Sequence, residues 1–86
     1  MKVKNIEGNH GPVRNQFVIE DDRGAEYFQS YDSIIAKKEN GEITLDVTCW
    51  DYSTTTGRYR NIFLGESKKE TERKIKDGTY KLAYLN

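Results

Sequence analysis

The feature that most constrains the fold is a change of hydrophobic period near the middle of the chain. Through residues 43–49 every second residue is apolar, which predicts a half-buried strand. From Ser53 onward this alternation stops. A helix over about 53–64, with Ser53 as its N-cap, would gather several apolar side chains on one stripe, namely Thr55, Tyr59, Ile62 and Phe63. Since both periods occur in one short chain, neither an all-helical nor an all-β fold fits.

Four earlier segments are predicted as strands, at 2–6, 16–20, 25–31 and 34–37. Gly24 ends a run of turn residues and favours a hairpin between the second and third segments. Asn40-Gly41 favours a tight hairpin before the alternating run at 43–49. The pattern leaves open whether 25–37 is one bent strand or two strands.

The C-terminal part has clear boundary signals. Gly65 ends the first helix, and Ser67 with Glu70 forms a capping box for a second helix over about 67–77. Residues 79–85 alternate again and predict a closing strand. The 86 residues therefore predict one α+β domain spanning 1–86. We expect a mostly antiparallel sheet of five or six strands, with both short helices on one face before the final strand.

Charge is balanced over the whole chain but not along it. Fourteen Lys and Arg face fourteen Asp and Glu, so no net field draws the protein to nucleic acid or an acidic membrane. Residues 1–51 contain six basic and ten acidic side chains, whereas residues 52–86 contain eight and four. This asymmetry indicates two differently charged surfaces, or simply a solvated, Lys-rich helical half.

The segment Trp50–Leu64 concentrates the unusual side chains, including the only Trp. Trp50, Tyr59 and Phe63 are expected to pack in the core, and Asp51 to pair with an arginine of the helix. The remaining large side chains fall outside the predicted apolar stripe and are the candidate partner-binding residues: Tyr52, Arg58, Arg60 and Asn61.

The same segment carries a resemblance. Its pattern, Trp-Asp-Tyr-Ser-x-Thr-Thr-x-x-Tyr-Arg-Asn-x-Phe-Leu, resembles a family of small proteins of unknown function from phages, plasmids and conjugative elements of Gram-positive bacteria. The stretches 28–36 and 67–85 also look like that family, so the resemblance covers most of the chain. It implies no catalytic residues. Cys49 stands where a larger residue is expected.

Catalytic and metal-binding constellations are weak. The single His10 and single Cys49 are separated by almost half the chain, and neither has the neighbours that a zinc site or a Cys–His nucleophile requires. A lone Cys is typical of a buried thiol in a reducing compartment, and no apolar run is long enough to span a membrane. We expect no enzyme activity, no metal, no cofactor and a cytoplasmic protein.

The leading hypothesis is a non-catalytic accessory protein of a phage or mobile element that binds a host or element-encoded protein. The uncovered face of the sheet leaves both monomer and homodimer open. The alternative is nucleic-acid binding, in which cations contact phosphates beside aromatic side chains. Its candidate residues are Arg58, Arg60, Lys68, Lys69 and Arg73.

Overall fold

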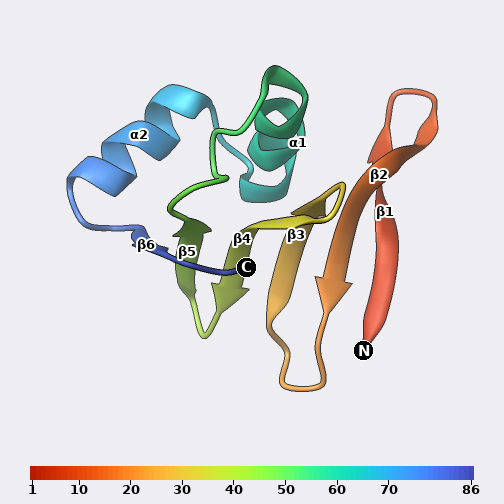
Figure 1. The fold of residues 1–86 in the computed structure, drawn as a ribbon, viewed down its shortest axis with the longest axis horizontal. Coiled ribbons are helices and arrows are strands. Elements are labelled where there is room, and N and C mark those ends of the chain that lie inside the picture. Colours follow the sequence, from red (N-terminus) through yellow and green to blue (C-terminus); the bar gives the residue numbers. More distant parts are fainter.

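The computed structural model describes all 86 residues and contains a six-stranded sheet with two helices (Figure 1). The elements are β1 (Lys2–Gly8), β2 (Gly11–Glu20), β3 (Glu26–Ser30), β4 (Ser33–Glu39), β5 (Glu42–Asp46), α1 (Thr54–Leu64), α2 (Lys68–Lys76) and β6 (Lys81–Ala83). The strand order in the sheet follows the chain. All neighbouring pairs are antiparallel except β5 and β6, which are parallel. The predicted α+β fold with a mostly antiparallel sheet is confirmed.

Tight turns connect the first five strands. Asn40 and Gly41 both have positive φ, at 53° and 77°, which confirms the predicted Asn-Gly hairpin. The open question about residues 25–37 is resolved in favour of two strands, because the chain reverses between β3 and β4 at Tyr31, whose φ is 57°. The first two strands are longer than the predicted 2–6 and 16–20 and form a hairpin, since they pair up to Gly8 and Gly11.

The prediction that the alternating strand runs to Cys49 is wrong. β5 ends at Asp46, whose buried carboxylate accepts hydrogen bonds from the backbone N–H groups of Thr48 and Cys49 and so turns the chain. The backbone N–H of Leu85 donates to the same carboxylate. Burial raises the pKa of Asp46, but these backbone hydrogen bonds outweigh burial and lower the pKa overall. Asp46 thus ties the end of β5 to the C-terminus.

The closing strand is shorter than predicted and lies at the edge of the sheet. β6 covers only Lys81–Ala83, and its residues are exposed. Tyr80, just before it, is buried in the core, whereas Leu82 and Tyr84 are exposed. The alternation of apolar residues at 79–85 therefore does not correspond to a half-buried face.

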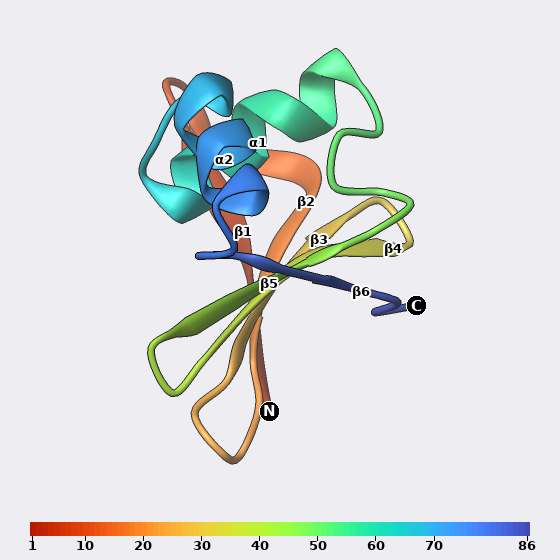
Figure 2. The ribbon, with the colours of Figure 1, turned by 90° about the vertical axis from the view of Figure 1, so that its left-hand side faces the viewer.

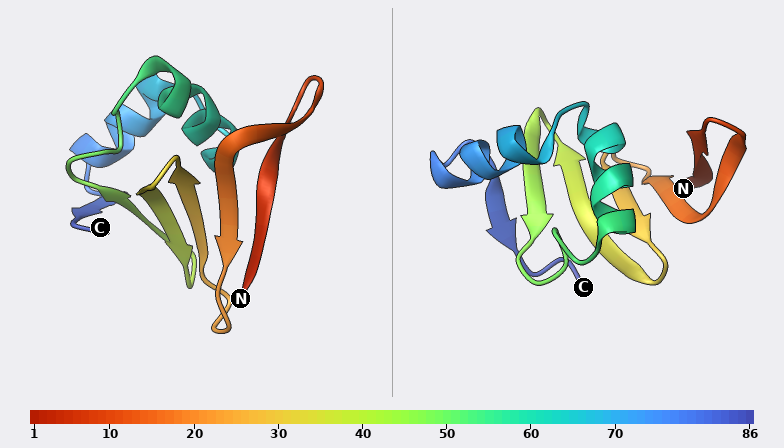
Figure 3. Two further views of the ribbon diagram at one scale, coloured as in Figure 1. Left: turned by 45° about the vertical axis from the view of Figure 1, so that its right-hand side comes forward. Right: turned by 90° about the horizontal axis from the view of Figure 1, so that it is seen from above.

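Both helices pack on the same face of the sheet (Figure 2). Phe28, Ala36 and Leu45 are paired across β3, β4 and β5 and are fully buried on that face. The Phe63 ring from α1 stacks on Phe28 with 5.8 Å between ring centroids. Ile75 from α2 packs against the same core. The β1–β2 hairpin extends beyond the rest of the sheet, and the opposite face has no helix over it (Figure 3).

A charged cluster fixes the connection between the helices, and we call it the Glu66 cluster. The Glu66 side chain is 4% exposed and accepts hydrogen bonds from Tyr80 Oη and Thr71 Oγ1, each at 2.6 Å, and from Lys74 Nζ at 2.7 Å. Burial raises the pKa of Glu66, but these hydrogen bonds outweigh burial and lower it overall. Both carboxylate oxygens are satisfied, and the cluster joins α2 to the segment before β6.

Candidate functional site

The four predicted partner-binding residues do not share one environment. Tyr52 is 69% exposed, Arg58 is exposed and Asn61 is half-buried. Arg60 is fully buried, with 0% of its surface exposed, so its expected position on the surface is wrong. The structure thus divides the predicted set into three surface residues and one interior cation.

The burial of Arg60 reflects which side of α1 faces the sheet. The buried residues of this helix are Thr56, Gly57, Arg60 and Phe63. They recur at the spacing of one helical face. The predicted stripe is wrong at Thr55 and Ile62, which are exposed. Phe63 is buried in the core, and Tyr59 and Trp50 are half-buried and pack against it, as expected. The buried face is polar at its N-terminal end, where Thr56 Oγ1 and Ser30 Oγ lie 2.9 Å apart in a hydrogen bond, and apolar at its C-terminal end.

Arg60 is held by the segment that precedes the helix. Its Nη1 donates to the Trp50 carbonyl at 2.6 Å and to Asp51 Oδ1 at 3.3 Å, and its Nη2 donates to Asn61 Oδ1 at 3.1 Å. The guanidinium carbon lies 5.2 Å from the centroid of the Trp50 ring, a cation–π contact. The remaining donor, Nε, is buried without a hydrogen-bond partner.

Gly57 packs against this arrangement at a cost to the helix. A mid-helix Gly is less favourable than Ala by about 1 kcal/mol. A Cβ at position 57 would lie 3.6 Å from Arg60 Nη2, 3.7 Å from Nη1 and 3.9 Å from Cζ, all at ordinary contact distance. Gly57 and the guanidinium are both buried, and Gly57 lies in the layer that covers Arg60.

Asp51 connects Arg60 to α2. Its Oδ1 pairs with Arg60, and its Oδ2 pairs with Lys68 Nζ at 2.8 Å. The hydrogen bond from Lys68 lowers the pKa of Asp51, with burial acting in the opposite direction and Arg60 adding to the lowering. The expectation that Asp51 pairs with an arginine of the helix is confirmed, and the partner is Arg60. We call Arg60, Trp50, Asp51, Asn61 and Lys68 the Arg60 cluster.

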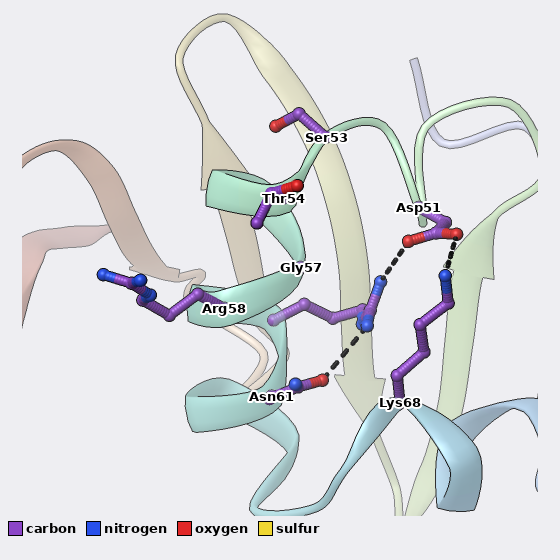
Figure 4. Close-up of a pocket in the computed structure, with 8 residues that line it drawn as sticks. Asp51, Ser53, Thr54, Gly57, Arg58, Asn61 and Lys68 are labelled. Atoms are coloured by element: carbon purple, nitrogen blue, oxygen red, sulfur yellow. Dashed lines mark hydrogen bonds and ion pairs between the residues drawn. The ribbon is translucent and has the colours of Figure 1, made fainter.

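The Arg60 cluster opens onto a hollow of about 770 Å³ beside the first half of α1. Figure 4 shows the side chains of Asp51, Asn61 and Lys68 pointing toward a common centre from the segment before α1, from α1 and from the start of α2, whereas Arg58 points away from Asp51. The lining contains three cations against one carboxylate and no hydrophobic residue: Asp51, Ser53, Thr54, Gly57, Arg58, Arg60, Asn61 and Lys68. It is suited to polar, negatively charged groups.

A second, smaller hollow adjoins the N-terminal side of α1 and has an aromatic lining. Tyr31 and Tyr52 line it together with Ser30, Asp32 and Ser33. Tyr31 is 53% exposed, and its backbone N–H donates to the Asn15 carbonyl at 2.7 Å. Sequence reasoning missed Tyr31, because its position beside Tyr52 depends on the β3–β4 turn and on a contact across 21 residues.

The five residues of the predicted nucleic-acid surface are also divided. Arg60 is buried, and Lys68 is paired with Asp51. Lys69 and Arg73 are exposed on α2 and form no ion pair, and Arg73 lines a separate hollow with Trp50 and Ile75. The cations therefore do not form one continuous free surface.

The structure does not bring His10 and Cys49 together. His10 is exposed in the β1–β2 turn, and Cys49 follows β5. Strands β3 and β4 lie between the β1–β2 hairpin and β5 in the sheet. Burial and the neighbouring Asp46 raise the pKa of the Cys49 thiol. No three His, Cys, Asp or Glu side chains lie close enough to hold a metal ion. Neither helix has the length and apolar character that crossing a membrane requires.

Comparison with known proteins places the chain in a family. Residues 1–78 match the family of unknown function DUF8033, which covers most of the chain, and the chain belongs to it. No curated protein and no solved structure matches it.

Proposed function

We propose that this member of the DUF8033 family is a non-catalytic accessory protein that binds a protein partner through the surface over the first half of α1. The binding residues are Tyr52, Arg58 and Asn61, with Tyr31 beside them. We further propose that it serves a phage, plasmid or conjugative element and acts in the cytoplasm. The resemblance of the Trp50–Leu64 segment supports that origin.

The observation that carries the proposal is the pair of exposed tyrosines in one shallow hollow. Tyr31 and Tyr52 are 53% and 69% exposed and line it together. Tyr and Arg are enriched at protein interfaces and supply much of their binding energy. Arg58 is exposed on the same part of α1 and forms no ion pair. The two tyrosines offer an aromatic anchor, and Arg58 offers an unpaired cation on the helix that begins just after Tyr52.

Local backbone geometry adds support. Tyr31 has φ of 57°, in the left-handed region that residues other than Gly rarely occupy. Such conformations cost on the order of 1–3 kcal/mol and often occur at functional sites. The turn therefore presents a large aromatic side chain at a position where Gly or Asn would be less strained.

Nucleic-acid binding remains the second candidate. Arg58, Lys69 and Arg73 are exposed and form no ion pair, which favours contact with phosphates. This candidate expects affinity to fall steeply with salt, because each phosphate contact releases counterions. The burial of Arg60 and the pairing of Lys68 reduce the number of available contacts.

An affinity pull-down from a lysate of the Gram-positive host separates the two candidates. Wild type is compared with Tyr52→Ala/Arg58→Ala, with and without nuclease. Tyr84→Ala/Arg23→Ala is the matched control, because it removes one exposed Tyr and one exposed Arg elsewhere on the molecule.

A defined protein retained after nuclease treatment by wild type and control, and lost from Tyr52→Ala/Arg58→Ala, supports the proposal. Signal that disappears with nuclease supports nucleic-acid binding instead. Equal retention by all three proteins would contradict the assigned surface.

A further inference from the structure

We infer that the hollow of the Arg60 cluster binds a carboxylate group. This inference rests on the proposed function. The protein partner presents an acidic side chain, Asp or Glu, that enters this hollow, while neighbouring residues of the partner contact the tyrosines. The ligand class is a singly charged carboxylate, and the groups that receive it are Lys68 and Asn61, with the buried charge of Arg60 behind them.

Charge supports this assignment first. The whole chain has no formal net charge, yet the lining of this hollow has a formal charge of +2. Asp51 is shared between Arg60 and Lys68, so one carboxylate serves two cations. Arg58 adds a third cation at the rim. Such a concentration of one sign in a concave site attracts ligands of the opposite sign.

Incomplete compensation of Arg60 supports it next. A buried cation is costly unless its donors are satisfied. The Arg60 guanidinium has five N–H donors. The guanidinium forms three hydrogen bonds to other residues, all from Nη1 and Nη2, and its Nε has no partner. A ligand carboxylate in the hollow would add negative charge to a site that lacks it.

Uncommitted donors also line the hollow. The Lys68 side chain is half exposed and bonds only to Asp51 Oδ2, although an ammonium group has three donors. Asn61 uses its oxygen to accept from Arg60, and its amide nitrogen forms no hydrogen bond. A carboxylate can therefore receive charge-assisted bonds without breaking the existing cluster.

Gly57 keeps the hollow open. Any larger residue would place its Cβ directly on the guanidinium, at 3.6 Å from Nη2. Since Ala is the better helix former and fits at van der Waals distance, packing does not require Gly here. Gly57 and Asn61 line the hollow one helical turn apart, so the missing side chain leaves more space for a ligand beside Asn61.

The proposed protein partner favours a carboxylate over a phosphate, because Asp and Glu are the anionic side chains that an unmodified protein presents. Asp51 forms one wall of the hollow, and its charge repels any anionic ligand. Asp51 therefore limits affinity.

NMR titration of the isolated protein tests the inference. The probe is N-acetyl-aspartate N-methylamide, which presents one side-chain carboxylate, added at millimolar concentration, neutral pH and constant ionic strength. Inorganic phosphate is titrated in parallel. Lys68→Ala and Asp51→Asn are compared with Lys2→Ala, a control with the same charge change as Lys68→Ala at an exposed position on β1.

We expect saturable shifts at Gly57, Asn61 and Lys68, and weaker binding of phosphate. Lys68→Ala should weaken the carboxylate about tenfold, the size of a charge-assisted hydrogen bond. Asp51→Asn should tighten it, because Asn can still accept from Arg60 while the repulsion and the competition for Lys68 disappear. Lys2→Ala should bind as wild type does.

Shifts that do not saturate, equal affinity in Lys68→Ala, weaker binding in Asp51→Asn, or tighter binding of phosphate would overturn the carboxylate assignment. Because the probe is a small molecule and the protein is isolated, these results are independent of the pull-down. A hollow that binds the probe, in a protein that retains no partner, would contradict the proposed function alone.

Discussion

Two charged clusters hold the helices of this protein in place, and they differ in how completely their charged groups are hydrogen-bonded. In the Glu66 cluster, three donors surround one carboxylate whose side chain is 4% exposed. In the Arg60 cluster, a fully buried guanidinium retains an unpartnered Nε and lies beside an open hollow. Both clusters position a helix. Only the second has unused donors, positive charge and space together.

The difference separates structural from functional polar groups. A closed cluster with satisfied donors contributes stability and offers nothing to a ligand. An incompletely satisfied cluster contributes less stability than its charges allow and retains donors for an incoming group. The strained Tyr31 and the helix-weakening Gly57 each line one of the two hollows of the proposed binding surface.

The largest effect is expected from breaking the Glu66 cluster. Glu66→Ala leaves the Lys74 ammonium and the Tyr80 hydroxyl without their acceptor, and should lower the free energy of unfolding by about 3–5 kcal/mol. Chemical denaturation measures this. Glu72→Ala, which removes an exposed acid from the same helix, is the control and should change little. A loss in Glu66→Ala no greater than in the control would show that the cluster is not structural.

A similar but smaller loss is expected at Arg60. Arg60→Ala removes the bonds to the Trp50 carbonyl and to Asp51, and should lower the free energy of unfolding by about 2–4 kcal/mol. Unlike Glu66→Ala, it should also weaken carboxylate binding under conditions where the variant is folded. Carboxylate affinity equal to that of wild type in the folded variant would remove Arg60 from the binding site.

A further effect is expected from pH. The pKa of Glu66 is lowered by folding, so its contribution to stability is present above the ordinary pKa of 4.5 and is lost as pH falls through the lower, folded value. Thermal unfolding from about pH 7 to about pH 3 should show wild type losing more stability than Glu66→Gln. The variant isolates Glu66, because the pKa values of Asp46 and Asp51 are also lowered. Parallel curves for the two proteins would contradict the shift.

Local signals in the sequence predicted most of the fold. The caps at Ser53 and Ser67, the left-handed Gly65 and the Asn40-Gly41 turn depend on residues within a few positions of one another, and all are present. Strand ends were less predictable. β5 stops early because the buried Asp46 carboxylate accepts from the N–H groups of Thr48 and Cys49. It also accepts from Leu85, 39 residues away, and no local pattern records that contact.

The candidate site was predicted only in part, for the same reason. The segment around Trp50 was identified from its composition. Hydrophobic periodicity treats Arg as a surface residue, so the pattern placed Arg60 outside the core. In the structure Arg60 is buried and donates to the Trp50 carbonyl and to Asp51. Gly57 was the available signal: a mid-helix Gly leaves room for a large neighbouring group on the buried side.

The most direct test is one variant measured in two ways. Gly57→Ala is expected to raise the free energy of unfolding by about 0.5–1 kcal/mol, because Ala is the better helix former and its Cβ fits at ordinary contact distance. In the same sample, carboxylate binding followed by NMR should weaken several-fold, because the methyl group takes up space in the lining of the hollow. A more stable protein with weaker binding is the predicted result. A more stable protein that binds the carboxylate as wild type does would contradict the assignment of the Arg60 cluster as a binding site.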